Sequence, residues 1–144
     1  MPGPFAIDAS VFLNAFNPAE NGSQISKEVL ARLQASSIPL VAPNLLLPET
    51  AAAISRGQNN PELARQFTIT LSRLPHLILV PLDQSLAQQA MEIAALYHLR
   101  GSDAVYGAVA MRFACPLVTL DREQHDRVDS VLKTFYPFEL LPLL

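Results

Sequence analysis

The chain has 144 residues, half of them hydrophobic and only 16% charged, which is typical of one folded domain and excludes a disordered segment. Cys115 is the single cysteine, so an intramolecular disulfide and a thiolate metal cluster are excluded. The net charge of -3 argues against a uniformly basic nucleic-acid binder, although a local patch of arginine can still dominate such an encounter.

The first half of the chain alternates short apolar runs with segments of helical period. In chain order, we predict a strand over 5–7, helices over 11–16 and 23–35, a strand over 39–43 and a helix over 44–56. Asp8 closes the first strand, and residues 17–22 hold the Asn, Pro and Gly of a loop. Asn44 is a suitable N-cap for the helix that follows it.

The second half continues the same alternation. In chain order, we predict a helix over 63–74, a strand over 77–80, helices over 84–97 and 103–113, and a strand over 117–119. Asp83 and Ser102 are the expected caps of the last two helices. The apolar tail, 135–144, is a candidate for a final strand.

Short apolar strands that alternate with longer helices indicate an α/β fold, a three-layer sandwich with a central parallel sheet flanked by helices. We expect one such domain over residues 1–144. Functional sites in these sheets gather at the carboxyl ends of the strands. The order of the strands in the sheet stays open at this point.

Four acidic residues lie in surroundings that differ from those of the other acids. Asp8 and Asp121 each follow an apolar strand. Asp103 lies in the first turn of a largely apolar helix, and Glu49 lies within the apolar segment 45–54. A cap, a turn residue or a solvated helix edge would explain each acid alone, but the fold brings strand ends and helix starts together. We therefore expect the four side chains to converge.

Converging carboxylates repel one another, and no Lys or Arg lies at a spacing that obviously neutralises all four. A hard divalent cation, Mg²⁺ or Mn²⁺, is the expected compensation, because both ions prefer oxygen ligands. Such ions activate water and stabilise the leaving oxygen in phosphodiester cleavage. The four acids are thus candidates both for metal ligands and for catalytic residues.

Four segments in order resemble the motifs of PIN-domain ribonucleases, particularly the VapC-like toxins of toxin–antitoxin pairs. The segments are Ile7-Asp8-Ala9-Ser10-Val11, Pro43 to Ile54 with Glu49, Gly101-Ser102-Asp103-Ala104-Val105-Tyr106, and Leu117-Val118-Thr119-Leu120-Asp121. The resemblance covers about residues 5 to 130. It implies a PIN-like fold, endoribonuclease activity on RNA, homodimerisation and, for a toxin, a small antitoxin protein that blocks the site.

The resemblance also implies supporting residues. Ser10 and Thr119 match positions that support the acids by hydrogen bonding. A further acid often follows the fourth motif, and here Glu123 or Asp126 is available. Separately from the resemblance, Arg56, Arg100 and Arg122 lie near the acids in sequence and are candidates for holding RNA phosphates.

Two other functions stay open. A catalytically silent member of the same fold could act by complex formation through the apolar helices over 45–54 and 63–74. A small-molecule phosphatase is the less favoured alternative. We expect a cytoplasmic protein that does not enter membranes, because no apolar run approaches the ~20 residues of a membrane span and no secretory signal opens the chain.

Overall fold

The computed structural model describes residues 3–144, so the first two residues of the domain predicted over 1–144 lie outside it. Its framework is a five-stranded sheet in which every pair of neighbours is parallel. The strands are β1 (Phe5–Ile7), β2 (Leu40–Pro43), β3 (Leu77–Val80), β4 (Leu117–Val118) and β5 (Thr134–Phe135). Their spatial order is β3-β2-β1-β4-β5, which places the completely buried β1 at the centre.

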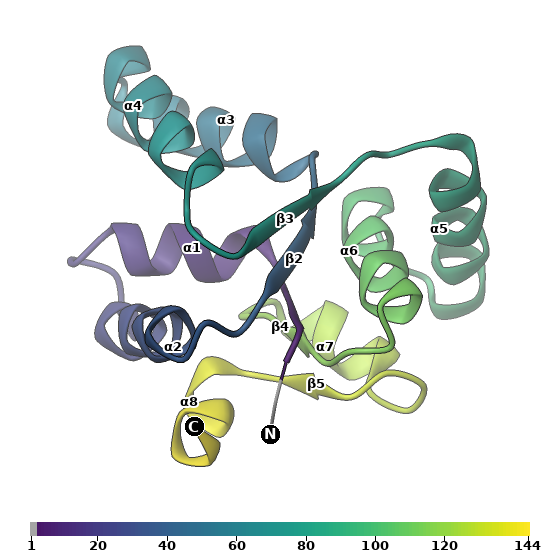
Figure 1. Cartoon of the computed structure of the whole chain (residues 1–144). Helices are drawn as coiled ribbons and strands as arrows, with labels where there is room; N and C mark the ends of the chain where they lie inside the picture. Colours follow the sequence, from purple (N-terminus) through teal and green to yellow (C-terminus); the bar gives the residue numbers. More distant parts are fainter. Residues whose placement is uncertain (1–2) are drawn as a thin grey trace.

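Helices cover both faces of the sheet (Figure 1). The helices are α1 (Ala9–Phe16), α2 (Ser23–Ala35), α3 (Leu46–Gln58), α4 (Pro61–Ser72), α5 (Gln84–Tyr97), α6 (Gly101–Arg112), α7 (Arg122–Val128) and α8 (Pro137–Leu140), followed by the 3-10 turn η1 (Leu141–Leu143). In Figure 1, α1 to α4 lie to the left of the sheet and α5 and α6 to its right. The predicted three-layer α/β fold with a parallel sheet is confirmed.

Helix α6 lies between the sheet and α5, and this position explains its composition. All eight residues from Asp103 to Ala110 are buried, because one face packs on β1, β2 and β4 while the other packs on α5. A helix that is covered all round needs apolar residues all round, and Asp103 and Tyr106 are the exceptions to that rule. Both exceptions belong to the candidate site described below.

Several predicted boundaries were wrong by a few residues, and the caps explain why. Helix α1 begins at Ala9 rather than residue 11, because Asp8 is its N-cap and accepts a hydrogen bond from Ser10 N. Helix α6 begins at Gly101, with Arg100 and not Ser102 at the N-cap. Asn44 caps no helix, since α3 begins at Leu46 with Leu45 at the N-cap. Helix α7, which the apolar pattern did not predict, begins directly after Asp121.

The tail differs most from its predicted structure. The strand expected within 135–144 is limited to Phe135, the second residue of β5, and the chain then forms α8 and η1. Pro137 occupies the first turn of α8, where its missing N–H costs nothing. The Tyr136 N–H donates to Glu139 Oε1 and closes that turn. The tail therefore folds back against α2 instead of extending the sheet.

None of the helices in the described part of the chain is both long enough and apolar enough to cross a membrane.

Candidate active site

The four predicted acids line one cavity of about 490 Å³ at the carboxyl edge of the sheet. Asp8, Glu49, Asp103 and Asp121 arrive there from four different elements. The other lining residues are Ala9, Ser10, Leu13, Leu45, Pro48, Ala52, Ala53, Arg56, Arg100 and Ser102. We call this cavity the acidic pocket. The expectation that these side chains converge is met in the structure, while their chemical roles stay proposals.

Two of the acids are N-caps of helices that begin where a strand ends. Asp8 follows β1, and its Oδ2 accepts a hydrogen bond of 3.0 Å from Ser10 N. Asp121 follows β4, and its Oδ1 accepts a hydrogen bond of 2.9 Å from Gln124 N. Because β1 and β4 are paired neighbours, both carboxylates lie at the same edge of the sheet. Each has one oxygen fixed by its helix and the other available for further contacts.

Glu49 reaches the pocket from the first turn of α3 and is held there by Tyr106. The Tyr106 hydroxyl donates a hydrogen bond of 2.7 Å to Glu49 Oε1. The Tyr106 ring is almost fully buried, so the hydroxyl has one fixed direction. The sequence alone predicted no role for Tyr106, although it lies three positions after Asp103 and hence on the same helix face.

Arg100 joins two of the acids. Its Nε donates to Asp103 Oδ2 at 3.1 Å, and its Nη2 donates to Asp121 Oδ2 at 2.7 Å. The premise that no basic residue obviously neutralises the acids therefore needs correction for this pair. Arg100 lies three residues before Asp103, but it lies 21 residues from Asp121, and only the fold brings that second pair together.

Burial and mutual repulsion disfavour ionisation in the pocket. Burial raises the pKa of Asp8, and the charge of Asp121 adds to that rise. Burial also raises the pKa of Glu49, with Asp8 and Asp103 adding to it. The pKa of Asp103 rises from 3.8 to about 6, first through burial and then through the charges of Asp8 and Asp121, against the opposing effect of Arg100. The pKa values of Asp8, Glu49 and Asp103 thus depend on the charges of neighbouring carboxylates.

Ser10 and Thr119 connect the two strand ends beneath the pocket. Their hydroxyl oxygens lie 3.5 Å apart. Ser10 Oγ accepts a hydrogen bond from Leu120 N, and Thr119 Oγ1 accepts one from Asp121 N. The two hydroxyls therefore fix the loop that carries Asp121 relative to the start of α1. This geometry suits the supporting role expected for both residues.

Gln124 lies after the fourth motif and reaches the site, and the sequence alone predicted no role for it. It is completely buried, and its Nε2 donates to Asp8 Oδ1 at 3.4 Å and to the Asp103 carbonyl at 3.2 Å. The structure does not bring the two acids considered for this place to the pocket. Asp126 is exposed and pairs with His125, and Glu123 pairs with Arg127. In the sequence, the available signal was a polar residue, Gln124, one helical turn after Asp121.

The three predicted phosphate-binding arginines lie at different places. Arg56 and Arg100 line the acidic pocket. Arg122 is exposed and is not among the residues that line it, but it directly follows Asp121. Positive charge therefore borders the pocket from α3 and from the residue before α6.

The donor set fits a hard divalent cation in type and in charge, because carboxylate oxygens are the preferred ligands of Mg²⁺ and Mn²⁺. As the side chains lie, no group of three or more His, Cys, Asp or Glu within residues 3–144 is arranged to hold an ion. In this arrangement Arg100 occupies Asp103 and Asp121, and Tyr106 occupies Glu49. An ion that binds Asp103 and Asp121 therefore has to displace Arg100.

Comparison with known proteins places this arrangement in a family. The family model of the PIN domain matches residues 5–131, most of the chain. No curated protein sequence matches the chain.

Several solved structures share the fold. VapC20 of Mycobacterium tuberculosis, described as a Sarcin-Ricin loop cleaving toxin, gives a TM-score of 0.70 at 19% identity, with 85% of this chain and 94% of that chain covered. FitAcB of Neisseria gonorrhoeae gives 0.71 at 17% identity, covering 95% and 100%. A toxin-antitoxin complex from Klebsiella pneumoniae gives 0.68 at 16% identity, covering 93% and 98%.

The raised pKa of Asp103 predicts a pH-dependent stability. As pH rises through 3.8 towards about 6, the unfolded chain releases a proton that the folded chain keeps, so stability is lost and remains lower above that range. Without divalent metal, Asp103→Asn should therefore raise the free energy of unfolding by about 1–3 kcal/mol at about pH 7.5 and by about a third as much at about pH 4.5. Urea unfolding at both pH values measures this. Glu92→Gln, an exposed change on α5, is the control, and equal effects of Asp103→Asn at both pH values would contradict the prediction.

Displacement of Arg100 predicts a change in metal affinity. Arg100→Met removes the competing cation, so Mn²⁺ should bind about three- to tenfold more tightly, because two solvent-exposed ion pairs worth at most about 1 kcal/mol each no longer have to be broken. Calorimetric titration of the purified chain measures the affinity. Arg73→Met, an exposed change at the end of α4, should leave it unchanged. Weaker binding by Arg100→Met would show that Arg100 assists the ion instead of competing with it.

Proposed function

This chain belongs to the PIN domain family, and from that premise we propose that it is a divalent-metal-dependent endoribonuclease and the toxin of a toxin–antitoxin pair. The observation that carries the proposal is the convergence of Asp8, Glu49, Asp103 and Asp121 in one pocket. The fold places that pocket where sites of parallel α/β sheets are expected. The similar structure from Mycobacterium tuberculosis is itself described as a cleaving toxin.

The four acids would hold Mg²⁺ or Mn²⁺, which when bound supplies an activated water and neutralises charge on the phosphodiester. The remaining work falls to the chain's own residues. Gln124 holds Asp8 and Tyr106 holds Glu49, so that neither carboxylate has to reorganise when substrate arrives. Ser10 and Thr119 fix the loop that carries Asp121. A preorganised site of this kind favours in-line cleavage of a positioned phosphodiester.

The arginines around the pocket would position the RNA backbone. A guanidinium presents its donors as a planar fork that matches phosphate oxygens. Arg56 lines the pocket, and its Nε makes only a long hydrogen bond of 3.4 Å to the Ala52 carbonyl. Arg100, once displaced from Asp103 and Asp121, is close to any phosphate that enters. Arg122 extends the basic border beyond the pocket.

Replacing Asp8 tests the enzyme proposal. Asp8→Asn keeps the N-cap of α1, since Asn caps helices about as well as Asp, but it removes one charge from the metal site. We expect RNA cleavage with Mg²⁺ or Mn²⁺ to fall at least about a hundredfold, and chelation of the metal to abolish cleavage by the unaltered chain. A fluorescence-quenched RNA substrate follows the reaction.

The matched control is Asp83→Asn, which alters another N-cap aspartate, at the start of α5 and outside the acidic pocket. It should cut RNA at the unaltered rate. Equal cleavage by Asp8→Asn and by the unaltered chain would defeat the proposal. Turnover of generic phosphoesters in place of RNA would favour the small-molecule phosphatase, and no turnover of either would favour the silent, complex-forming alternative.

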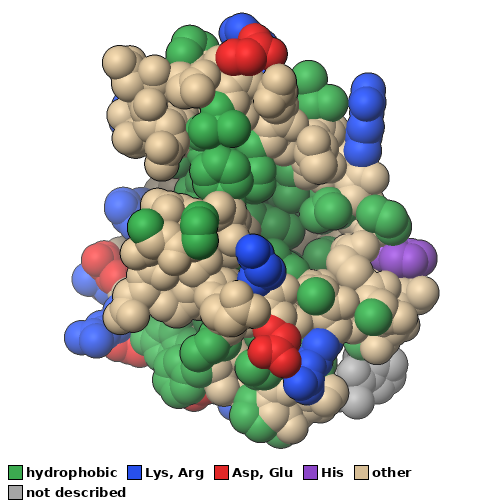
Figure 2. Space-filling view, turned by 90° about the vertical axis from the view of Figure 1, so that its left-hand side faces the viewer, with side chains coloured by type: hydrophobic (Ala, Val, Ile, Leu, Met, Phe, Trp, Pro, Cys, Tyr) green, Lys and Arg blue, Asp and Glu red, His purple; other side chains and the backbone are tan. Residues whose placement is uncertain are grey.

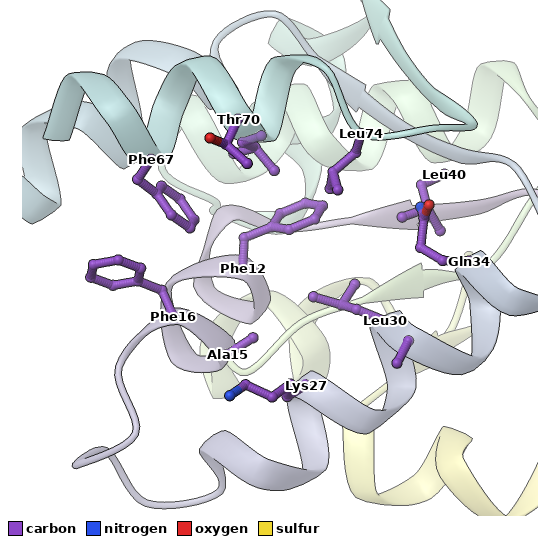
Figure 3. A pocket seen from close by; sticks show the side chains of 12 residues that line it. Phe12, Ala15, Phe16, Lys27, Leu30, Gln34, Leu40, Phe67, Thr70 and Leu74 are labelled. Atoms are coloured by element: carbon purple, nitrogen blue, oxygen red, sulfur yellow. The ribbon is translucent and has the colours of Figure 1, made fainter. Parts of the chain in front are cut away.

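An apolar groove supports the proposed antitoxin partner. A hollow of about 310 Å³ lies between α1, α2 and α4, and Figure 2 shows it as a depression lined by hydrophobic side chains. In Figure 3, Phe12 and Phe16 of α1 lie opposite Phe67 of α4 and opposite Leu74, which follows α4. We propose that an amphipathic helix of the antitoxin fills this groove. The similar structure from Klebsiella pneumoniae is a toxin-antitoxin complex.

Two polar side chains at the groove indicate which chemical groups the partner should carry. The Nε2 atom of Gln34 is buried and has no hydrogen-bond partner among the described residues, and its side chain points into the groove (Figure 3). An acceptor from the partner would satisfy it. Lys27 contributes a positive charge at the same groove. The helix that fits best therefore carries an acidic residue beside its apolar face.

A charge in the groove tests the partner proposal. Ala31 is exposed and lines the groove, so Ala31→Glu should not disturb the core but should reduce capture of the antitoxin at least about tenfold, by placing an unpaired charge against an apolar face. The readout is co-purification with the product of the neighbouring reading frame when both are expressed together. Ala19→Glu, exposed and outside the groove, is the control. Equal recovery with both variants would place the partner elsewhere.

We also propose the homodimer that family membership implies. Leu82, Met91 and Leu96 are between 42% and 65% exposed and lie just before or along α5, beside a cavity that shares Leu45 and Ser102 with the acidic pocket. Light scattering of the purified chain gives its mass in solution, and a strict monomer would remove this part of the proposal. Cytoplasmic location stays a prediction.

A further inference from the structure

Three aromatic rings form a stack at the start of the C-terminal tail. The His125 and Tyr136 rings lie 4.1 Å apart between centroids and are nearly parallel, at 6°. The Tyr136 and Phe138 rings follow at 5.6 Å and 9°. His125 is largely buried at one end, whereas Phe138 is 61% exposed at the other. One wide aromatic face therefore remains open to solvent.

The pairing of the strands places this stack next to the acidic pocket. Val118 of β4 pairs with Phe135 of β5, and Thr119 N donates to the Phe135 carbonyl. Tyr136 is the next residue, directly after β5, where it is the N-cap of α8. Thr119 is also the residue that fixes the backbone of Asp121. The stack thus begins one strand away from the proposed catalytic acids.

The acidic side chains around the stack lie at its His125 end, and the nearby cation is Arg122. Asp126 and Glu139 lie at the His125 end, at 3.0 Å from its Nδ1 and 3.6 Å from its Nε2. Burial raises the pKa of the Tyr136 hydroxyl, and the Arg122 guanidinium opposes that rise through its charge and a hydrogen bond. Arg122 is thus close to Tyr136, and it directly follows Asp121 in the chain.

We propose that the outer face of Phe138, backed by Tyr136 and His125, is a stacking platform for an unpaired base of the RNA substrate, with Arg122 on the phosphate between that base and the acidic pocket. The proposal rests on the ribonuclease function proposed above and adds a binding subsite to it. Aromatic faces beside a cation are the recurring means of holding single-stranded nucleic acid. Since every base has a flat face, the platform takes any base and sets the path of the strand.

The platform is rigid before RNA arrives. Pro137 and Leu140 are buried and anchor α8, while Glu139 Oε1 accepts a hydrogen bond from the Tyr136 N–H. Helix α8 also packs on α2. A ring that is already held in place loses little freedom when a base stacks on it, so the contact contributes more to affinity.

Fluorescence anisotropy with a short labelled single-stranded RNA, in the presence of chelator so that nothing is cut, measures binding directly. Phe138→Ala should weaken binding about tenfold, the usual effect of removing one stacking ring, and Phe138→Trp should keep it or tighten it. Leu143→Ala, another exposed apolar change in the tail, is the matched control and should bind as the unaltered chain does. All variants should melt at the unaltered temperature.

An RNA with one base removed completes the test. At one position, loss of the base should weaken binding to the unaltered chain and should not weaken binding to Phe138→Ala any further. If the chain cuts RNA but Phe138→Ala binds like the unaltered chain, the platform is wrong and the ribonuclease stands. If the chain neither binds nor cuts RNA, both proposals fail. If Phe138→Ala loses a protein partner and keeps RNA binding, the aromatic face is a protein contact and the platform is again wrong.

Discussion

The parallel pairing of β1 with β4 is the constraint on which the site depends. It brings Asp8 and Asp121 to one edge of the sheet, although 113 residues separate them, as their numbers show. Neither carboxylate would approach the other without that framework, since like charges repel and the charge of Asp121 adds to the raised pKa of Asp8. The fold holds the groups together through backbone hydrogen bonds of the sheet and through helix caps. Compensation then has to come from Arg100 or from bound cations.

The sequence could predict the acids because their signal is local. Each strand-end carboxylate follows a short apolar run, and each helix-start carboxylate interrupts an apolar helix, so Asp8 and Asp103 stand out without a structure. The spacing relates Arg100 to Asp103. The contacts of Arg100 with Asp121, of Tyr106 with Glu49 and of Gln124 with Asp8 could not be assigned in the same way, because these partners lie between 21 and 116 residues away. The structure of the tail was predicted wrongly for a related reason. An apolar run with two prolines suits a buried helix turn as well as a strand, and only packing on α2 decides between them.

The carboxylates of the site are held in place by hydrogen bonds, but the polar groups around them are not fully satisfied. Hydrogen bonds from Ser10, Tyr106 and Gln124 leave the carboxylates little freedom to move apart. Gln124 Oε1 is buried and has no hydrogen-bond partner among the described residues, so even the supporting amide is not fully satisfied. Such a cluster lowers the stability of the folded chain at neutral pH, and proteins commonly keep strain of this kind where function requires it. Positive charge from a bound metal ion or from a partner relieves the repulsion among the carboxylates.

Helix α1 connects the two surfaces of the proposed toxin. Its first residue follows Asp8, and Leu13 faces the acidic pocket, while Phe12 and Phe16 line the apolar groove on the other side of the helix. The helix has only 8 residues, so a partner seated in the groove contacts a body that carries a proposed metal ligand at its N-cap. One short helix therefore supplies side chains to both surfaces, and the groove proposed for the partner adjoins a helix whose N-cap is a proposed metal ligand.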